Sequence, residues 1–333
     1  MDKKLTFKMK VLRFTKKYKK RTTPHTLIAT AILLFLLILI PAMDQVLVQG
    51  KPEVVTQTGT FTASFTGDLN FNDYYEKYIN DNGTTKITQD VIRYLETSDY
   101  VTGNVIGTFT ETEAKLLADS HFSVVDVYDE TAAETTILEK NDLPYVGTRS
   151  IGEDNVVYQQ INDVTVATLG TSEARFVDDL KWIKEAKLNA DIVVVHINWY
   201  EKYTTKVSDS QRSIAKALSD AGADFIVGHN TRVLQPIEIY QDTVIMYSLG
   251  NFLHGEVYAS TQDSAIIQYT TDANFSSITM SIIPLSLTYG RPHPAVNLTE
   301  VLNRHNIFDV LTRELPDTIT TTETNGVLSF TLH

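Results

Sequence analysis

The chain of 333 residues contains no cysteine, which excludes disulfide bonds and metal sites built from thiolates. It also shows no internal repeat of fixed period and no low-complexity tract. Its length is sufficient for one large domain, or two modest ones, with a substantial core.

Charge is absent from one long stretch near the N-terminus. Residues 27–43 form an uncharged run of 17 residues, close to the lower limit for a helix that crosses a hydrocarbon layer about 30 Å thick. The preceding residues 1–25 carry a net charge of +9, and because the whole chain carries −12, the other 308 residues carry −21. Lysine and arginine are retained on the cytoplasmic side of a membrane, so we expect the basic tail inside and the acidic body outside.

This pattern predicts four parts: a basic cytoplasmic tail (1–25), a transmembrane anchor (26–43), a linker (44–60) and an extracellular α/β domain (61–333). A cleaved signal peptide is the alternative interpretation. The long charged region, and the lack of a small-x-small cleavage site after the apolar run, favour an uncleaved signal-anchor that crosses the cell membrane once.

Strands and helices alternate beyond residue 60. The hydrophobic spacing predicts strands at 61–66, 100–104, 122–127, 164–169, 191–195 and 224–227, and helices at 87–97, 115–119, 177–188 and 208–221. Strands at 236–240, 243–248, 265–270, 278–285 and 326–332 follow with short turns, together with a mostly helical stretch at 296–315. These elements predict a layered α/β domain in which two sheets pack face to face.

Four of the expected strands end in polar loops: Gly67-Asp68, Gly103-Asn104, His196-Ile197-Asn198 and Gly228-His229-Asn230. Strand ends that are distant in sequence can meet at one edge of a sheet, where Asp, Asn and His side chains could ligate a divalent cation. An ordinary turn with a capping histidine is the alternative for the loop at residue 229.

Together and in this order, the loops resemble those of the CapA/PgsA family of membrane-anchored poly-γ-glutamate capsule biosynthesis proteins. The similar stretches include SFTGD, SDYVTGN, ADIVVVHINW, QRSIAKALSDAGADFIVGHN and VIMYSLGNF. The resemblance implies an α/β fold: a two-sheet calcineurin-like metallophosphatase sandwich flanked by helices and preceded by one N-terminal transmembrane helix. It also implies that the retained positions Asp68, Asn104 and His229 would hold a metal.

Other positions depart from the family pattern. Ile106 replaces a glutamate, residues 128–131 lack a histidine, and Asn198 stands in place of a further histidine. Lys202 replaces another glutamate, and Arg232 ends a loop that holds histidine in the family. A unit positive charge about 4 Å from another costs roughly 4 kcal/mol at an effective dielectric near 20, so either cation would oppose a metal unless it points away.

Some neighbouring groups offer compensation. His196 lies two residues before Asn198 on the same strand face, and Asp129 and Glu130 could supply oxygen ligands suited to Mg²⁺, Ca²⁺ or Mn²⁺. The resemblance implies a Mn, Mg or Zn ion if the site functions, with His196, Asn198 and His229 as candidate catalytic groups. The segments 110–117 and 170–180 are short beside the family, which predicts a shallow cleft.

Retained scaffold motifs beside substituted ligands favour a pseudoenzyme, a membrane-anchored subunit of poly-γ-glutamate synthesis and export with little or no activity of its own. The alternative is a metal-dependent hydrolase or transferase that acts on a phosphoester or γ-glutamyl amide. A surface-exposed binding module is a third hypothesis. The expected partners are other membrane subunits of a poly-γ-glutamate synthase complex, membrane lipid and, through cations or a basic patch, the polymer itself; nucleic acid is not expected.

Overall fold

The computed structural model describes residues 7–18, 22–47, 60–71, 73–128, 132–147, 155–255, 259–272 and 274–332. The chain divides into two compact units, residues 1–51 with 297–299, and residues 52–296 with 300–333.

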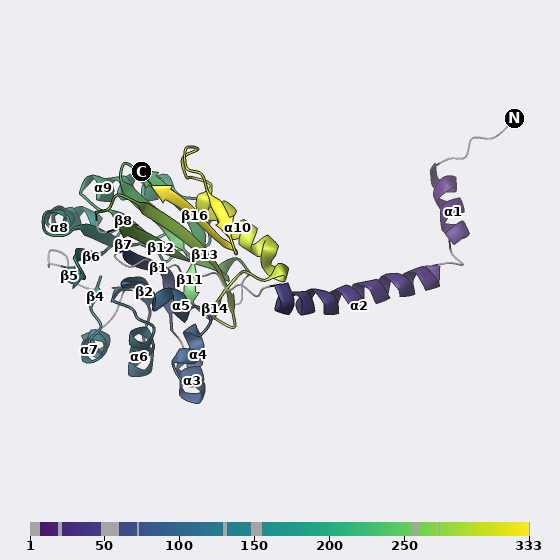
Figure 1. Cartoon of the computed structure of the whole chain (residues 1–333), viewed down its shortest axis with the longest axis horizontal. Coiled ribbons are helices and arrows are strands. Elements are labelled where there is room, and N and C mark those ends of the chain that lie inside the picture. Colours follow the sequence, from purple (N-terminus) through teal and green to yellow (C-terminus); the bar gives the residue numbers. More distant parts are fainter. Residues whose placement is uncertain are drawn as a thin grey trace. The chain divides into compact units, whose positions relative to one another are not determined.

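The N-terminal unit contains two helices, α1 (Phe7–Tyr18) and α2 (Thr22–Leu47) (Figure 1). The uncharged run lies within α2, and large apolar side chains such as Phe35, Leu37 and Ile38 are exposed. Within the part of the chain that the structure describes, no helix proved both long enough and apolar enough to cross a membrane. Helix α2 includes the first residues of the expected linker, and residues 48–59 lie outside the described part, so the boundaries of tail, anchor and linker stay predictions.

The second unit contains two sheets. The larger has the order β15-β16-β13-β12-β1-β2-β3-β4, with β11 beside β1 and β14 beside β13. Its strands are β1 (Thr60–Asn70), β2 (Tyr100–Ile106), β3 (Val124–Tyr128), β4 (Tyr145–Val146), β11 (Asn251–Leu253), β12 (Asp263–Asp272), β13 (Ile278–Thr288), β14 (Arg291–Pro294), β15 (Thr322–Thr324) and β16 (Val327–Leu332). Strands β1 to β4 run parallel, whereas β12, β13 and β16 pair antiparallel.

The smaller sheet has the order β5-β6-β7-β8-β10-β9. Its strands are β5 (Val156–Ile161), β6 (Val164–Ser172), β7 (Ile192–Asn198), β8 (Phe225–His229), β9 (Leu234–Tyr240) and β10 (Thr243–Leu249). Strands β6, β7, β8 and β10 are parallel, so their carboxyl ends lie at one edge.

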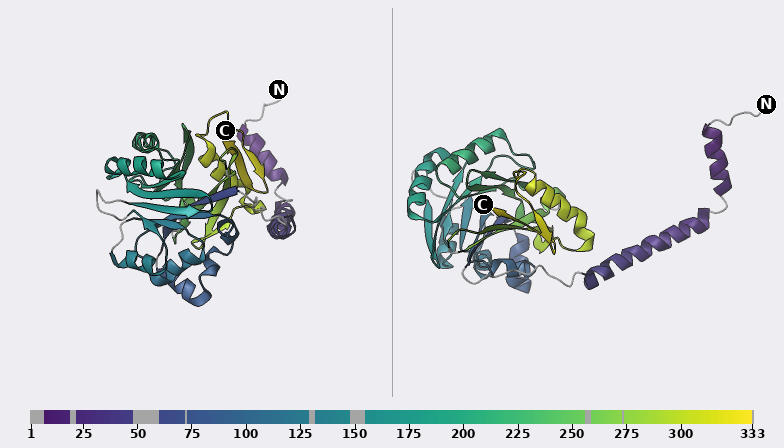
Figure 2. Two further views of the ribbon diagram at one scale, coloured as in Figure 1. Left: turned by 60° about the vertical axis from the view of Figure 1, so that its left-hand side comes forward. Right: turned by 45° about the horizontal axis from the view of Figure 1, so that its top comes forward.

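Helices cover both outer faces of the sheet pair (Figures 1 and 2). Beside the larger sheet lie α3 (Asp73–Asn82), α4 (Thr85–Thr88), α5 (Ile92–Leu95), α6 (Glu111–Asp119) and α7 (Ala132–Lys140); beside the smaller lie α8 (Phe176–Asn189) and α9 (Asp209–Asp220). One apolar cluster fills the space between the sheets, with residues such as Phe65 from the larger and Phe225 from the smaller. Helix α10 (Val301–Thr312) packs against β9 and β13.

The expected mixed α/β architecture with two sheets is confirmed. One expected helix is wrong: residues 87–97 contain only the end of α4 and the four-residue helix α5. Between them the chain turns, and the Val91 amide donates to the Thr88 carbonyl three residues back. The helical stretch expected at 296–315 contains a shorter α10, and β5 was not expected at all.

Candidate functional site

Three polar side chains lie side by side on neighbouring parallel strands of the larger sheet. Asp68 of β1 is in register with Asn104 of β2, and Asn104 is in register with Asp126 of β3. The register between β1 and β2 shifts between Phe65 and Asp68, where β1 has one extra residue. The Asp68 amide donates to the Gly250 carbonyl at 2.9 Å. Glycine is required at position 67, since a Cβ there would lie 2.1 Å from the Gly250 oxygen.

The smaller sheet contributes the opposing side chains. Asn198 at the end of β7 is in register with His229 at the end of β8, and His196 lies two residues earlier on β7. Asp68, Asn104, Asp126 and His196 have no exposed surface, and Asn198 and His229 are 2% and 1% exposed. We call these six residues the buried polar cluster.

Two asparagines connect the two carboxyl groups of the cluster. The Asn104 amide nitrogen donates to Asp68 Oδ1 at 3.1 Å and to Asn198 Oδ1 at 3.2 Å. The Asn198 amide nitrogen in turn donates to Asp126 Oδ2 at 2.7 Å. Asn198 therefore links the sheets, because it uses both ends of its amide across the interface.

The two imidazoles are stacked, with ring centroids 5.1 Å apart and planes inclined by 16°. His196 Nδ1 lies 2.8 Å from His229 Nε2, His229 Nδ1 lies 3.1 Å from Asp68 Oδ1, and His196 Nε2 lies 2.9 Å from the Thr102 hydroxyl. If Thr102 donates to His196, His196 to His229, and His229 to Asp68, every ring nitrogen has one partner.

Burial controls protonation in the cluster. It raises the pKa of Asp126 to about 8, against the lowering effects of the Asn198 hydrogen bond and of Arg175. Burial, together with His229, also holds the pKa of His196 well below its ordinary value. Burial therefore favours the uncharged forms of both His196 and Asp126.

Two further groups hold the β7 and β8 ends in place. Trp199 is fully buried, and its indole nitrogen donates to the Tyr247 carbonyl at 2.9 Å. Asn230 donates from its backbone to Asp68 Oδ2 at 2.9 Å and from its side chain to the Trp199 carbonyl at 2.9 Å. The loops are thus fixed by the same residues that surround Asp68.

The structure brings together the candidate residues that the sequence singled out. Asp68, Asn104, His196, Asn198 and His229 all belong to the cluster. The two cations proposed to oppose a metal lie differently: the Lys202 side chain is exposed, and Arg232 hydrogen-bonds to His254. Asp129 and Glu130 fall outside the described residues.

Sequence reasoning missed Asp126, which was passed over in favour of residues 128–131. The available signal was a lone acidic residue inside the apolar strand VVDVY, since a carboxyl group at such a position needs a buried partner. Thr102 was missed as well, as its hydroxyl is one of many in the chain.

The residues of the cluster do not fit a tightly held divalent cation. Both oxygens of Asp68 already accept hydrogen bonds, and His196 Nδ1 and His229 Nε2 contact one another, so these donor atoms are already paired within the cluster. Among the described residues, no group of three or more His, Asp or Glu side chains has a metal-holding arrangement. Two buried oxygens, Asn104 Oδ1 and Asp126 Oδ1, have no hydrogen-bond partner in the described structure.

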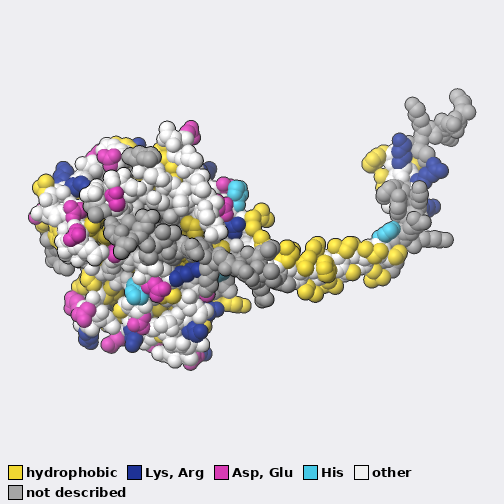
Figure 3. Space-filling view, viewed as in Figure 1, with side chains coloured by type: hydrophobic (Ala, Val, Ile, Leu, Met, Phe, Trp, Pro, Cys, Tyr) yellow, Lys and Arg dark blue, Asp and Glu magenta, His cyan; other side chains and the backbone are white. Residues whose placement is uncertain are grey.

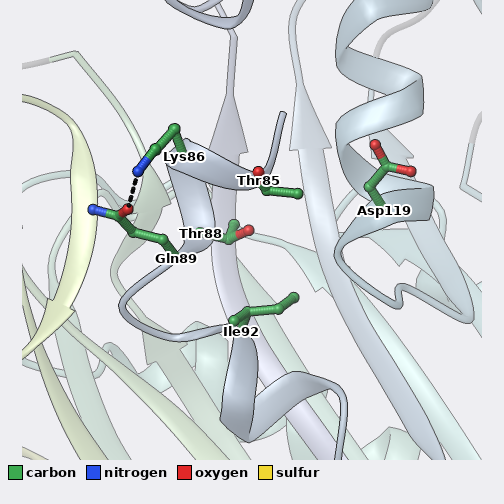
Figure 4. A pocket seen from close by; sticks show the side chains of 6 residues that line it. All are labelled: Thr85, Lys86, Thr88, Gln89, Ile92 and Asp119. Atoms are coloured by element: carbon green, nitrogen blue, oxygen red, sulfur yellow. Dashed lines mark hydrogen bonds between the residues drawn. The ribbon is translucent and has the colours of Figure 1, made fainter. Parts of the chain in front are cut away.

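A surface pocket of about 250 Å³ lies elsewhere, between α4, α5 and α6 on the outer face of the larger sheet (Figure 4). It is lined by Thr85, Lys86, Thr88, Gln89, Ile92 and Asp119. Lys86 is already hydrogen-bonded to Gln89, and Asp119 accepts from Thr84. None of the cluster residues lines this pocket.

Comparison with known proteins identifies the class. A family model described as "Bacterial capsule synthesis protein PGA_cap" matches residues 126–256. The chain is 32% identical to the PGA biosynthesis protein CapA of Bacillus subtilis (strain 168), covering 94% of this chain and 93% of that protein. It is 31% identical to the capsule biosynthesis protein CapA of Bacillus anthracis, covering 94% and 88%. The chain therefore belongs to the CapA family of bacterial capsule synthesis proteins, as its motifs indicated.

A solved structure of a predicted phosphoesterase from Streptococcus pneumoniae TIGR4 is also similar, with 8% identity and a TM-score of 0.32, covering 69% of this chain and 91% of that one. This likeness is too slight to support any conclusion about activity.

Proposed function

We propose that the protein takes part in poly-γ-glutamate capsule synthesis or export as a membrane-anchored, outward-facing subunit without catalytic activity of its own. The role in capsule synthesis is supported by the relatives named for it, which match nearly the whole chain. The absence of catalysis is supported by one observation: the candidate catalytic and metal-holding side chains are buried and hydrogen-bond to one another. Side chains in this state stabilise the contact between the two sheets and do not face a substrate.

Metal content and turnover test this proposal directly. The full-length protein, purified in detergent, is analysed by inductively coupled plasma mass spectrometry and assayed for phosphodiesterase and γ-glutamyl hydrolase activity with added Mn²⁺, Mg²⁺ or Zn²⁺. We expect metal well below one equivalent and no turnover above buffer. Stoichiometric metal together with turnover would overturn the proposal.

Complementation in the cell tests whether His229 has a structural or a catalytic role. His229→Gln is introduced into a strain that lacks the native gene, and capsule is normalised to the amount of folded protein. We expect capsule per folded molecule to stay within about twofold of wild type, because a structural group acts only through stability. Loss of one catalytic group typically lowers the reaction rate about a hundredfold or more, so a catalytic His229 would give a much larger loss of capsule.

A metal-dependent hydrolase or transferase is the second candidate. It is favoured by the convergence of Asp68, Asn104 and His229 and by the two buried oxygens, on Asn104 and Asp126, that have no hydrogen-bond partner. The same metal and turnover measurements decide between the two functions.

Membrane anchoring belongs to this proposal. The uncharged run in α2, the basic residues before it and the acidic body after it support an uncleaved anchor with the N-terminus in the cytoplasm. Intact mass spectrometry of the protein from membranes should give the full 37.4 kDa chain. A shorter chain that begins near residue 44 would indicate a cleaved signal peptide.

A further inference from the structure

Helix α1 combines positive charge with exposed apolar side chains. Its sequence, FKMKVLRFTKKY, contains four lysines, one arginine and no acidic residue. Lys8, Lys10, Arg13 and Lys16 are all exposed. The helix itself therefore carries positive charge from its first turn to its last and no negative charge.

The apolar side chains of α1 are exposed as well. Phe7 and Val11, one helical turn apart on the same face, are 83% and 44% exposed, and Met9 and Leu12 are each 52% exposed. In Figure 3, hydrophobic and basic side chains lie close together along α1. Basic helices with exposed aromatic and aliphatic residues are typical of segments that lie in a membrane interface.

We infer that α1 is an interfacial helix that binds the surface of an anionic lipid bilayer, with Phe7 and Val11 inserted and the basic side chains at the lipid phosphates. Anionic lipid satisfies both features, because it offers negative charge at the headgroups and an apolar layer directly beneath them. A nucleic acid would satisfy the charge but would leave Phe7 and Val11 in water.

The inference rests on the anchoring proposed above. Only three residues separate the end of α1 from the start of α2, and three residues span at most about 11 Å. If α2 is anchored in the bilayer, α1 is therefore held close to its surface. Each basic side chain near an anionic surface favours the bound state about fivefold, an effect that salt weakens.

The lack of cysteine allows single-site labelling of the full-length chain. Phe7→Cys and Lys16→Cys are nine residues apart and therefore lie on opposite sides of α1. Each variant is labelled with an environment-sensitive fluorophore and reconstituted into vesicles of phosphatidylcholine, with or without phosphatidylglycerol. An aqueous collisional quencher then reports whether the label is in water or in lipid.

We expect the label at position 7 to be quenched at least fivefold less in vesicles that contain phosphatidylglycerol than in phosphatidylcholine alone. The label at position 16 should remain accessible in both. High salt, or the combined K8Q, K10Q and R13Q substitutions, should return position 7 to the water-exposed value. Glutamine has a helix propensity close to that of lysine and arginine, so these substitutions preserve the helix.

Equal quenching at position 7 in the two kinds of vesicle would overturn the inference, as would equal shielding at positions 7 and 16. Flotation of the vesicles distinguishes this failure from failure of the anchor. A chain that floats with the vesicles while position 7 stays exposed contradicts only the role of α1, whereas a chain that does not float contradicts the anchoring.

Discussion

Asp126 is a fully buried carboxyl group, and its burial favours the protonated form in the folded chain. Burial raises its pKa to about 8, from 3.8 for the free side chain. Between these two values the folded chain holds a proton that the unfolded chain has released. The stability that this proton contributes is therefore complete below about pH 4 and is lost as the pH rises through about 8.

The first prediction is that the free energy of unfolding falls with pH across this window. The contribution of Asp126 has an upper limit of about 1.4 kcal/mol per pH unit. Asp126→Asn keeps an acceptor for the Asn198 amide but does not titrate, so its stability should depend less steeply on pH. Chemical denaturation of both proteins between about pH 5 and 8 measures the difference between the slopes. Identical slopes would show that Asp126 is ionised in the folded chain.

The second prediction concerns the amide that links the sheets. Asn198→Ala removes one acceptor and one donor and leaves Asn104 and Asp126 without these partners in a buried site. We expect a loss of about 2–4 kcal/mol of stability. Asn189→Ala is the matched control, because its amide bonds only the exposed end of α8 and should change stability by less than about 0.5 kcal/mol. Similar losses in the two variants would mean that Asn198 is not a link between the sheets.

Most residues of the cluster could be named from the sequence because polar residues followed apolar strands. Asp68, Asn104 and His229 stood at the ends of such strands, and parallel strands bring those ends together. The hydrogen bonds among these residues could not be predicted, since they depend on how closely the two sheets approach. Asp126 shows the limit most clearly: the sequence contains the lone acid, but only the packing shows that it meets Asn198.

At the scale of elements, the unit formed by α9 and β8 was the easiest to predict. Ser208 caps α9: its hydroxyl accepts from the Gln211 backbone amide at 3.2 Å, and the Gln211 side-chain oxygen accepts from the Ser208 backbone amide at 3.0 Å. The strand that follows has an apolar run and ends in Gly228-His229. In this segment the capping residue, the helical spacing of apolar residues and the apolar strand pattern all predict the observed elements.

Segments with a less regular pattern were harder to predict from the sequence. Residues 87–97 had helical spacing, yet the chain turns between α4 and α5. Strand β5, VVYQQI, contains two consecutive glutamines and lies at the edge of its sheet, so its pairing with β6 was not evident from hydrophobicity. Such elements are fixed by their neighbours more than by their own composition.

The third prediction tests the cap. Ser208→Ala removes the acceptor for the Gln211 amide and should lower stability by about 1 kcal/mol. Ser213→Ala, in the same helix, removes only an exposed contact to the Asp209 carbonyl and should change stability little. Denaturant titration of both variants provides the comparison; a larger loss for Ser213→Ala would contradict the capping role.

At the scale of the whole molecule, the distribution of charge is the dominant feature. Residues 1–25 carry +9 and the rest of the chain −21. A body with this charge repels a polyanion at low salt, so under the proposed function we expect it to act through its placement at the membrane and not by binding the polymer directly. An anchor of the proposed kind would raise the effective concentration of the body at any membrane partner without a new contact.

The fourth prediction follows from this placement. A chain that lacks residues 1–51 should leave the membrane fraction and should restore little or no capsule in a strain without the native gene. The same truncated chain fused to an unrelated single-pass anchor of the same orientation should restore most of it. Restoration by the untethered chain would show that placement is unimportant.

Because each polar side chain in the cluster is the hydrogen-bond partner of the next, the six positions cannot change independently. A single replacement leaves the neighbouring polar side chain buried without its hydrogen-bond partner, which lowers stability. Replacing both members of a contact by apolar groups of matching shape can leave stability almost unchanged. Relatives that diverge at Asn198 should therefore also diverge at Asp126 or Asn104. Substitutions at these positions would therefore occur together, because the side chains are hydrogen-bond partners of one another.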